Sequence, residues 1–399
     1  MVITQRHAGH NPADALRATV AAARALQAQG RRIARLDIGE PHFPTPSHIV
    51  DAAHAAMRDG DTKYVSPQGL LELRDAIATA QRARGVDASA EQVVVSPGVK
   101  PMLMYALMAI CHPGDEILVP DPGYPGYAAS ARLAGASVRE YSLMGVDASF
   151  AIDVDALRAS ITPATRVLVL NSPHNPTGTI IERETLESIA ELAMQHHLWV
   201  LSDEIYGALT YNSAPPPSIA TLPGMRDRTI IVDGFSKAYA MTGWRLGYAV
   251  LPSTLVGAVT ALVADGSTCT PPFVQRAGVA ALTGPQDAVV EMRRAYARGR
   301  NALTAELRKV NDIRVATPGG ALYVFAEVSG LMRRARISSS AELAMRLLHK
   351  YHVACVGGSA FGERGEHHLR FSFAVAREQL DEALGRLAAF GNDDNLRDT

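Results

Sequence analysis

The chain has 399 residues, of which 47% are hydrophobic and 20% are charged. This balance is typical of a globular protein with enough residues for two or three domains and a large core. The 39 basic and 40 acidic residues leave a net charge of −1, so no bulk field favours binding to nucleic acid or to a membrane surface. The three cysteines lie far apart and form no CxxC or Cys/His spacing, which argues against a disulfide framework and against a metal site.

The first ten residues lack the apolar segment of a secretory signal, and no apolar run reaches the length of a membrane span. We therefore expect a cytoplasmic protein. An Ala-rich helix is predicted over residues 11–29, with Pro12 near its start and Gly30 after its end. A short strand is predicted over 33–38. Three prolines make residues 39–46 irregular, and helices follow over 47–59 and 70–84.

Short apolar strands then alternate with helices. The strands are predicted at 93–95, 116–119, 137–141, 167–170, 199–201 and 230–232, and the helices at 100–111, 127–134, 154–160 and 183–196. Strands that are apolar throughout and separated by helices indicate a mostly parallel sheet covered on both faces.

A long helix is predicted from Gly284-Pro285 to about Val310. Strands follow at 321–327, 353–356 and 369–373, and a last helix at 377–390. We expect an α/β fold in which residues 46–285 form a large domain around the mostly parallel sheet. Residues 1–45 and 286–399 would form a smaller α+β domain, with the N-terminal segment packed on the C-terminal part.

Polar groups follow several of these strands, at the sheet edge where α/β proteins bind ligands. Gly98 opens a helix after the first strand, where backbone N–H groups can meet an anion; such turns are also common as purely structural features. Asn175 lies in a loop stiffened by two prolines, which fits either a ligand-binding amide or a rigid turn. Asp203 follows a buried strand, where a carboxylate needs a partner or serves as a helix N-cap.

The segment from Ser236 to Tyr248 is the most informative of the chain. Lys237 has few charged neighbours, a hydroxyl directly before it and Arg245 eight positions after it. A lysine that is partly desolvated and near another cation can act as an amine nucleophile beside a bound phosphate. The alternative is an ordinary exposed lysine in a loop.

Taken together, a phosphate-binding turn, an acid, an asparagine and a lysine match the needs of pyridoxal phosphate (PLP). The chain resembles the class I/II aminotransferases, which are PLP enzymes of fold type I, and is similar to their bacterial aspartate-aminotransferase-like subgroup. The resemblance covers residues 11–390. Its motifs are Leu36–Pro46, Lys63–Arg74, Val94–Lys100, Gly114–Tyr127, Asn171–Gly178, Ser202–Tyr206, Ser236–Gly247 and Leu369–Phe373.

The resemblance implies the catalytic roles. Lys237 would form the Schiff base with the cofactor and then move the proton at the substrate Cα. Asp203 would pair with the pyridine nitrogen and keep it protonated. Asn175 and Tyr206 would hydrogen-bond the ring hydroxyl, and Tyr124 would stack on the ring.

The resemblance also implies the binding roles. The phosphate would be held by the backbone of Gly98, Val99 and Lys100 and by the side chains of Ser236 and Arg245. Tyr64 would reach the phosphate in the neighbouring subunit, which implies a homodimer. Arg370 would bind the substrate α-carboxylate in a bidentate pair, assisted by the Gly39 N–H and by Asn175.

Two departures from the family pattern bear on the reaction. His42 stands where Asp is common and resembles the histidine of arginine oxidases of this fold; the alternative is variation in a loop. Leu16 stands where the members that prefer dicarboxylic substrates have a threonine that works with the lysine matching Lys100, and Thr19 would substitute only with a shifted register. The expected activity is a ping-pong aminotransferase acting on an L-amino acid and a 2-keto acid. The alternatives are a PLP-dependent oxidase, a β/γ-lyase, or a non-enzymatic regulator.

Overall fold

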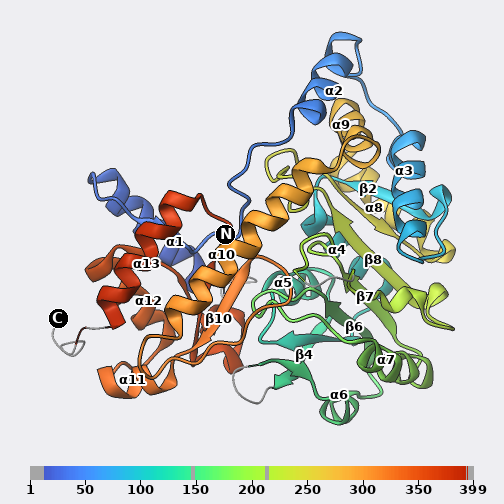
Figure 1. Cartoon of the computed structure of the whole chain (residues 1–399). Coiled ribbons are helices and arrows are strands. Elements are labelled where there is room, and N and C mark those ends of the chain that lie inside the picture. Colours follow the sequence, from blue (N-terminus) through green and yellow to red (C-terminus); the bar gives the residue numbers. More distant parts are fainter. Residues whose placement is uncertain (1–12, 145–148, 212–214, 392, 394–399) are drawn as a thin grey trace, which may run out of the picture.

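The computed structural model describes residues 13–144, 149–211, 215–391 and 393. Its central feature is a twisted eight-stranded sheet (Figure 1). In spatial order the strands are β2 (Val93–Ser96), β9 (Gly247–Val250), β8 (Thr229–Gly234), β7 (Trp199–Asp203), β6 (Thr165–Asn171), β3 (Glu116–Asp121), β4 (Ser137–Met144) and β5 (Ala151–Ile152). Neighbours from β8 to β4 are parallel, whereas β9 is antiparallel to both of its neighbours and β5 is antiparallel to β4. The prediction of a mostly parallel sheet is confirmed.

Helices cover both faces of this sheet, which explains why its strands are apolar throughout. One face packs against α4 (Val99–Ile110), α5 (Gly126–Leu133) and α8 (Ser253–Ser267). The other packs against α2 (Ser47–Arg58), α3 (Leu71–Ala83), α7 (Arg183–Gln195) and α9 (Pro272–Thr283). In β2, Val94 joins the first core while Val93 and Val95 join the second, as the alternation of a strand requires. The short helix α6 (Val154–Ser160) packs beside β4.

A second body of structure lies beside the central sheet, on the left of Figure 1. It contains a three-stranded sheet of β10 (Tyr323–Glu327), β13 (His368–Ser372) and β12 (Val356–Gly357), together with the parallel pair β1 (Ala34–Arg35) and β11 (Val353–Ala354). Its helices are α1 (Ala13–Ala28), α10 (Asp287–Leu307), α11 (Ser329–Ala335), α12 (Ser340–Tyr351) and α13 (Arg377–Gly391). The division of the chain at residues 46 and 285 stays a prediction.

Several elements differ from those predicted. The strand expected over 33–38 is reduced to Ala34–Arg35, because only these residues pair with β11. The strand expected over 353–356 is two strands, since β11 pairs with β1 and β12 pairs with β13. The first helix begins in the described chain at Ala13, so the predicted residues Asn11 and Pro12 lie outside the described part. Strands β5 and β9 and helices α8, α9, α11 and α12 were not predicted.

Short 3₁₀ turns connect some of these elements, at Ala90–Gln92, Ile219–Thr221, Arg226–Arg228, Gly358–Phe361 and Glu363–Gly365. Within the described ranges, none of the helices combines the length and the apolar character that crossing a membrane requires.

Candidate active site

A cavity of about 340 Å³ lies at the carboxyl ends of the parallel strands, where the sequence placed the candidate groups. Every predicted site residue lines it except Gly98 and Tyr64. The lining residues are Leu16, Gly39, Val99, Lys100, Leu103, Tyr124, Tyr127, Asn171, Asn175, Asp203, Ile205, Tyr206, Ser236, Lys237, Thr242, Arg245, Tyr323 and Arg370. We refer to this cavity as the catalytic pocket.

Lys237 follows β8 and points into the pocket. Its Nζ donates a hydrogen bond of 2.6 Å to the carbonyl oxygen of Gly39. Burial lowers the pKa of Lys237, while Tyr323 and Glu40 act in the opposite direction. A desolvated amine with a lowered pKa is available as a nucleophile and as a base, which an exposed surface lysine is not.

Asp203 ends β7 and is buried against the same pocket. Its Oδ2 accepts a hydrogen bond of 2.8 Å from the Tyr127 hydroxyl, and its Oδ1 accepts one of 3.2 Å from the Ile205 N–H. Burial raises the pKa of Asp203 to about 6, and these two hydrogen bonds oppose the rise. The residues after Asp203 form a turn, so this carboxylate does not cap a helix. A buried carboxylate of this kind is stabilised by a cation placed opposite it.

Arg370 on β13 brings the second body of structure into the site. Its Nη1 donates to Asn175 Oδ1 at 3.0 Å and its Nη2 donates to the Asp37 carbonyl oxygen at 2.9 Å. The guanidinium lies between two rings, 4.2 Å from the Tyr323 centroid and 4.6 Å from that of Phe361. Its Nε is buried and has no partner among the described residues. This donor, on a fixed guanidinium, is suited to a carboxylate.

The start of α4 forms an open cradle for an anion. Gly98 precedes the helix with φ of +101°, and no side chain caps the first N–H groups. A Cβ at Gly98 would overlap Nη2 of Arg245, so only glycine allows the arginine to lie against this turn. Free helix N–H groups beside a guanidinium are a ready site for a phosphate.

Two tyrosines of the pocket were not predicted from the sequence. Tyr127 holds Asp203, and the Tyr323 hydroxyl is 2.9 Å from the Tyr206 hydroxyl. Tyr323 also packs over the Gly39 backbone, where a Cβ would overlap its hydroxyl. Tyr127 carried a weak signal, since it begins a helix directly after the Tyr124 motif. Tyr323 carried none, because a tyrosine inside an apolar strand resembles any other core residue.

The remaining predicted residues differ in their placement. Tyr64 is 85% exposed and is not part of its own chain's catalytic pocket. His42 is also outside the pocket and packs against Phe43 and Tyr296, which favours ordinary loop variation over a role in an oxidase. Leu16 lines the pocket, whereas the hydroxyl of Thr19 donates to the Ala15 carbonyl oxygen.

The residues present fit PLP. Lys237 offers a desolvated amine, Asp203 offers a buried carboxylate that suits a protonated ring nitrogen, and the turn at Gly98 with Arg245 suits a phosphate group. These groups occupy the sides of one cavity of about 340 Å³, which is within the usual range for a cofactor site.

Comparison with known proteins agrees with this geometry. Residues 31–387 match the family model for aminotransferase class I and II. The chain is 37% identical over 365 residues to an aspartate aminotransferase of Musicola paradisiaca, covering 91% of this chain and 90% of the relative. It is 38% identical over 361 residues to aromatic-amino-acid aminotransferase 2 of Thermococcus litoralis, covering 89% of this chain and 90% of the relative.

A solved structure of the Thermus thermophilus aspartate aminotransferase with maleate superposes with a TM-score of 0.88 and 37% sequence identity, covering 94% of this chain and 96% of that chain. The match to the family model includes all the residues that line the pocket except Leu16. The chain therefore belongs to the class I and II aminotransferases of fold type I, and it is a PLP-dependent transaminase that acts on amino acids and keto acids.

Proposed function

We propose that this transaminase works by a ping-pong mechanism in which Lys237, Asp203 and Tyr206 are the catalytic residues. The observation that carries this proposal is the convergence of a desolvated lysine, a buried carboxylate and an arginine with a free donor on one pocket. When bound, PLP supplies an electron sink for the charge that forms at the substrate Cα. Lys237 moves the proton at that carbon, and the Asp203 carboxylate keeps the ring nitrogen protonated.

Arg370 orients the substrate. Its guanidinium is fixed by Asn175, by the Asp37 carbonyl oxygen and by two aromatic rings, so little rotational freedom is lost when a carboxylate binds. The Gly39 N–H and the Asn175 amide assist. Fixing the α-carboxylate in this way places the Cα proton near Lys237, and such positioning accounts for a large part of the barrier reduction in enzymes.

Tyr206 and Asn175 bind the ring hydroxyl in this proposal, Tyr124 packs on the ring, and the phosphate lies at the start of α4. The phosphate ligands would be the backbone N–H groups of Gly98, Val99 and Lys100 and the side chains of Ser236 and Arg245.

We further propose that the pocket accepts both acidic and apolar substrate side chains. The Lys100 side chain lines the pocket, is exposed and has no ion-pair partner among the described residues, so it can meet a distal carboxylate. Leu16 on α1 lines the same pocket and offers an apolar contact. The relatives named above include an aspartate aminotransferase and an aromatic-amino-acid aminotransferase, which is consistent with a pocket of mixed character.

A Lys100→Met variant tests this proposal, because methionine keeps the length and removes the charge. We expect kcat/KM for aspartate and glutamate to fall about 10- to 100-fold, while phenylalanine and leucine change less than about threefold. An equal loss of kcat/KM for acidic and apolar amino acids would contradict the proposal that Lys100 binds the side-chain carboxylate of the substrate.

We propose that the protein acts as a homodimer in which Tyr64 reaches the phosphate in the partner's pocket. Tyr64 is 85% exposed in the single chain, and the neighbouring apolar side chains of Met57 and Leu71 are exposed as well. Exposed apolar groups gathered near one segment are typical of an interface. In a mixed dimer of Tyr64→Ala and Lys237→Ala chains, the pocket with the intact lysine receives its tyrosine from the other chain. We expect that pocket to regain wild-type cofactor affinity; affinity no better than in the Tyr64→Ala homodimer would show that Tyr64 acts within its own chain.

We also propose a cytoplasmic location. The three cysteines are free, and Cys111 and Cys355 are buried, as is usual for proteins of a reducing compartment.

The comparisons favour transamination over the oxidase and lyase alternatives. A screen of amino donors with 2-oxoglutarate, with oxygen and ammonia recorded in parallel, tests this assignment. Oxygen uptake would support the oxidase, and release of ammonia and a keto acid in the absence of any acceptor would support the lyase.

A further inference from the structure

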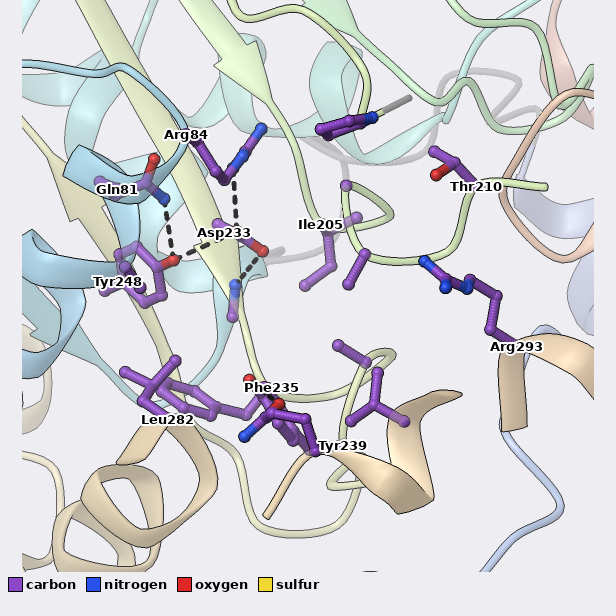
Figure 2. Close-up of a pocket in the computed structure, with 18 of the residues that line it drawn as sticks. Gln81, Arg84, Ile205, Thr210, Asp233, Phe235, Tyr239, Tyr248, Leu282 and Arg293 are labelled. Carbon is purple, nitrogen blue, oxygen red and sulfur yellow. Dashed lines mark hydrogen bonds and ion pairs between the residues drawn. The ribbon is translucent and has the colours of Figure 1, made fainter. Parts of the chain in front are cut away.

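A second cavity of about 340 Å³ lies beside the catalytic pocket (Figure 2). Its walls come from the end of α3, the loop after β7, the end of β8 and the start of α10, with Tyr248 of β9 and Leu282 of α9. We call it the flanking cavity. None of the roles assigned to the transamination site uses it.

The two cavities share their dividing wall. Along the segment after β8, Ser236 and Lys237 line the catalytic pocket, whereas Phe235, Ala238 and Tyr239 line the flanking cavity. Ile205, two residues after Asp203, lines both. A ligand that shifts residues on the flanking side of this wall therefore acts directly on the segments that carry Lys237 and Asp203.

One end of the flanking cavity is polar and is closed by hydrogen bonds (Figure 2). Asp233 Oδ1 accepts from the Gly234 N–H at 2.6 Å, and its Oδ2 accepts from the Tyr248 hydroxyl at 3.1 Å. Gln81 Nε2 donates to the same hydroxyl at 3.1 Å. The Asp233 side chain keeps 17% of its surface exposed although its surroundings are buried.

The charges at this end do not cancel. Arg84 donates to Glu204 Oε2 at 2.6 Å and is 4.0 Å from Asp233, so one cation faces two carboxylates. Glu204 is satisfied, since its Oε1 also accepts from the hydroxyls of Ser202 and Ser218. When Asp233 is ionised, this end of the cavity therefore carries one negative charge that Arg84 does not balance.

An unused acceptor lies at the same end. Gln81 is 1% exposed, and its Oε1 has no hydrogen-bond partner among the described residues. Both Gln81 and Asp233 meet the Tyr248 hydroxyl, but the Gln81 oxygen is enclosed by protein, so Asp233 is the acceptor that a ligand in the cavity can reach. An ammonium group supplies several donors at once to a carboxylate such as that of Asp233.

The opposite end carries the complementary charge. Figure 2 shows Arg293 of α10 across the cavity from Asp233. Arg293 is exposed and has no ion-pair partner within the described ranges. Between the two ends the wall is mainly apolar, with Ile205, Phe235 and Val289 among its residues.

We propose that the flanking cavity binds a small molecule with an ammonium group and a carboxylate at opposite ends of an apolar body, and that its binding alters transamination. The ammonium group meets Asp233, and the carboxylate meets Arg293. The poles of such a molecule match those of the cavity, whereas an α-amino acid, with both charges next to one carbon, spans only one end.

The titration of Asp233 provides a signature. Burial raises the pKa of Asp233 to about 7, and Arg84 on α3 opposes the rise. The other ionisable groups around the cavity and its polar end are Glu204 after β7, Tyr239 after β8, Tyr248 on β9 and Arg293 on α10. A proton on Asp233 competes with the ammonium group. The apparent affinity should therefore rise with pH, by about tenfold between pH 6 and pH 8.

The test is calorimetric titration of the PLP-loaded enzyme with 6-aminohexanoate at pH 6 and pH 8. We expect saturable binding that is about tenfold tighter at pH 8. Asp233→Asn keeps the acceptor for its neighbouring N–H but loses the charge, and it should weaken binding at least tenfold and abolish the pH dependence. Arg293→Gln should also weaken binding at least tenfold. The matched controls Asp265→Asn and Arg294→Gln change exposed residues of the same types that do not line the cavity, and they should bind as wild type does.

Occupancy of the catalytic pocket is excluded separately. Arg370→Met should retain the binding, and in the wild type 6-aminohexanoate should change kcat without competing with the amino donor. Three outcomes would overturn the proposal. They are no saturable binding up to on the order of 10 mM, binding lost in Arg370→Met but kept in Asp233→Asn and Arg293→Gln, or simple competition with the donor.

Discussion

Replacing Tyr127 by phenylalanine should raise the pKa of Asp203 and make cofactor binding depend on pH. The Tyr127 hydroxyl donates a 2.8 Å hydrogen bond to Oδ2 of the buried carboxylate, which otherwise accepts from the Ile205 N–H. This hydrogen bond favours the ionised form, whereas burial disfavours it. The substitution removes the hydroxyl and leaves the ring, so that packing is largely preserved.

The magnitude follows from the strength of such a bond. A hydrogen bond to a charged group contributes about 1.5–3 kcal/mol, and 1.36 kcal/mol corresponds to a tenfold change in an ionisation constant. The pKa of Asp203, which is about 6, should therefore rise to roughly 7 or 8. At pH 7 the ionised fraction would fall from about nine-tenths to between about one half and one tenth. Since we propose that the ionised form pairs with the ring nitrogen, cofactor affinity should fall about two- to tenfold at pH 7 and recover near pH 9.

The assay is titration of the cofactor-free protein with PLP from pH 6 to pH 9, followed by absorbance. Tyr105→Phe is the matched control, because Tyr105 is a buried tyrosine of α4 that does not line the catalytic pocket. Its titration should follow the wild type. A loss of affinity in Tyr127→Phe that is the same at every pH, or no loss at all, would refute the assignment of this hydrogen bond.

Two further substitutions test the anion sites. Arg370→Lys should lower kcat/KM about 100-fold for every amino acid, because an ammonium cannot form the bidentate pair, and a loss restricted to one substrate class in steady-state kinetics would speak against α-carboxylate binding. Gly98→Ala should weaken PLP binding at least tenfold, since a Cβ there would overlap Arg245. The control is Gly114→Ala: Gly114 has a similar φ of +100° but open space around it, so this substitution should lower stability only. Equal PLP affinity of the two alanine variants, measured by titration, would argue against the phosphate cradle at Gly98.

The central sheet was predictable because its strands are buried on both faces. Runs such as Val93–Val95 and Ile230–Val232 contain only apolar residues, because both faces of these strands are packed against helices, and helices separate most of the strands in the sequence. The site residues at the strand ends were predictable for the same reason. Asp203 lies at the end of an apolar strand and Lys237 lies three residues after another, and the resemblance to a family added their roles.

Other features have no local signal. The hydroxyl contacts from Tyr127 to Asp203 and from Tyr323 to Tyr206 join residues 76 and 117 positions apart, and a buried tyrosine on a helix or strand resembles any core residue. Helix α8 is apolar on most of its surface, so its periodicity is weak. Helix α12 is different, since it is strongly amphipathic and Ser339 caps its start, and its signal was overlooked.

The most direct test of the proposed ping-pong mechanism is a single half-reaction. PLP-loaded enzyme is mixed with an amino donor in the absence of any keto acid, and released keto acid, ammonia and oxygen uptake are measured together. The ping-pong mechanism predicts one keto acid per catalytic site, no ammonia and no oxygen uptake, with a further turnover only after a second keto acid is added, and no product from Lys237→Ala. Continued product formation without an acceptor, or wild-type product release from Lys237→Ala, would contradict it.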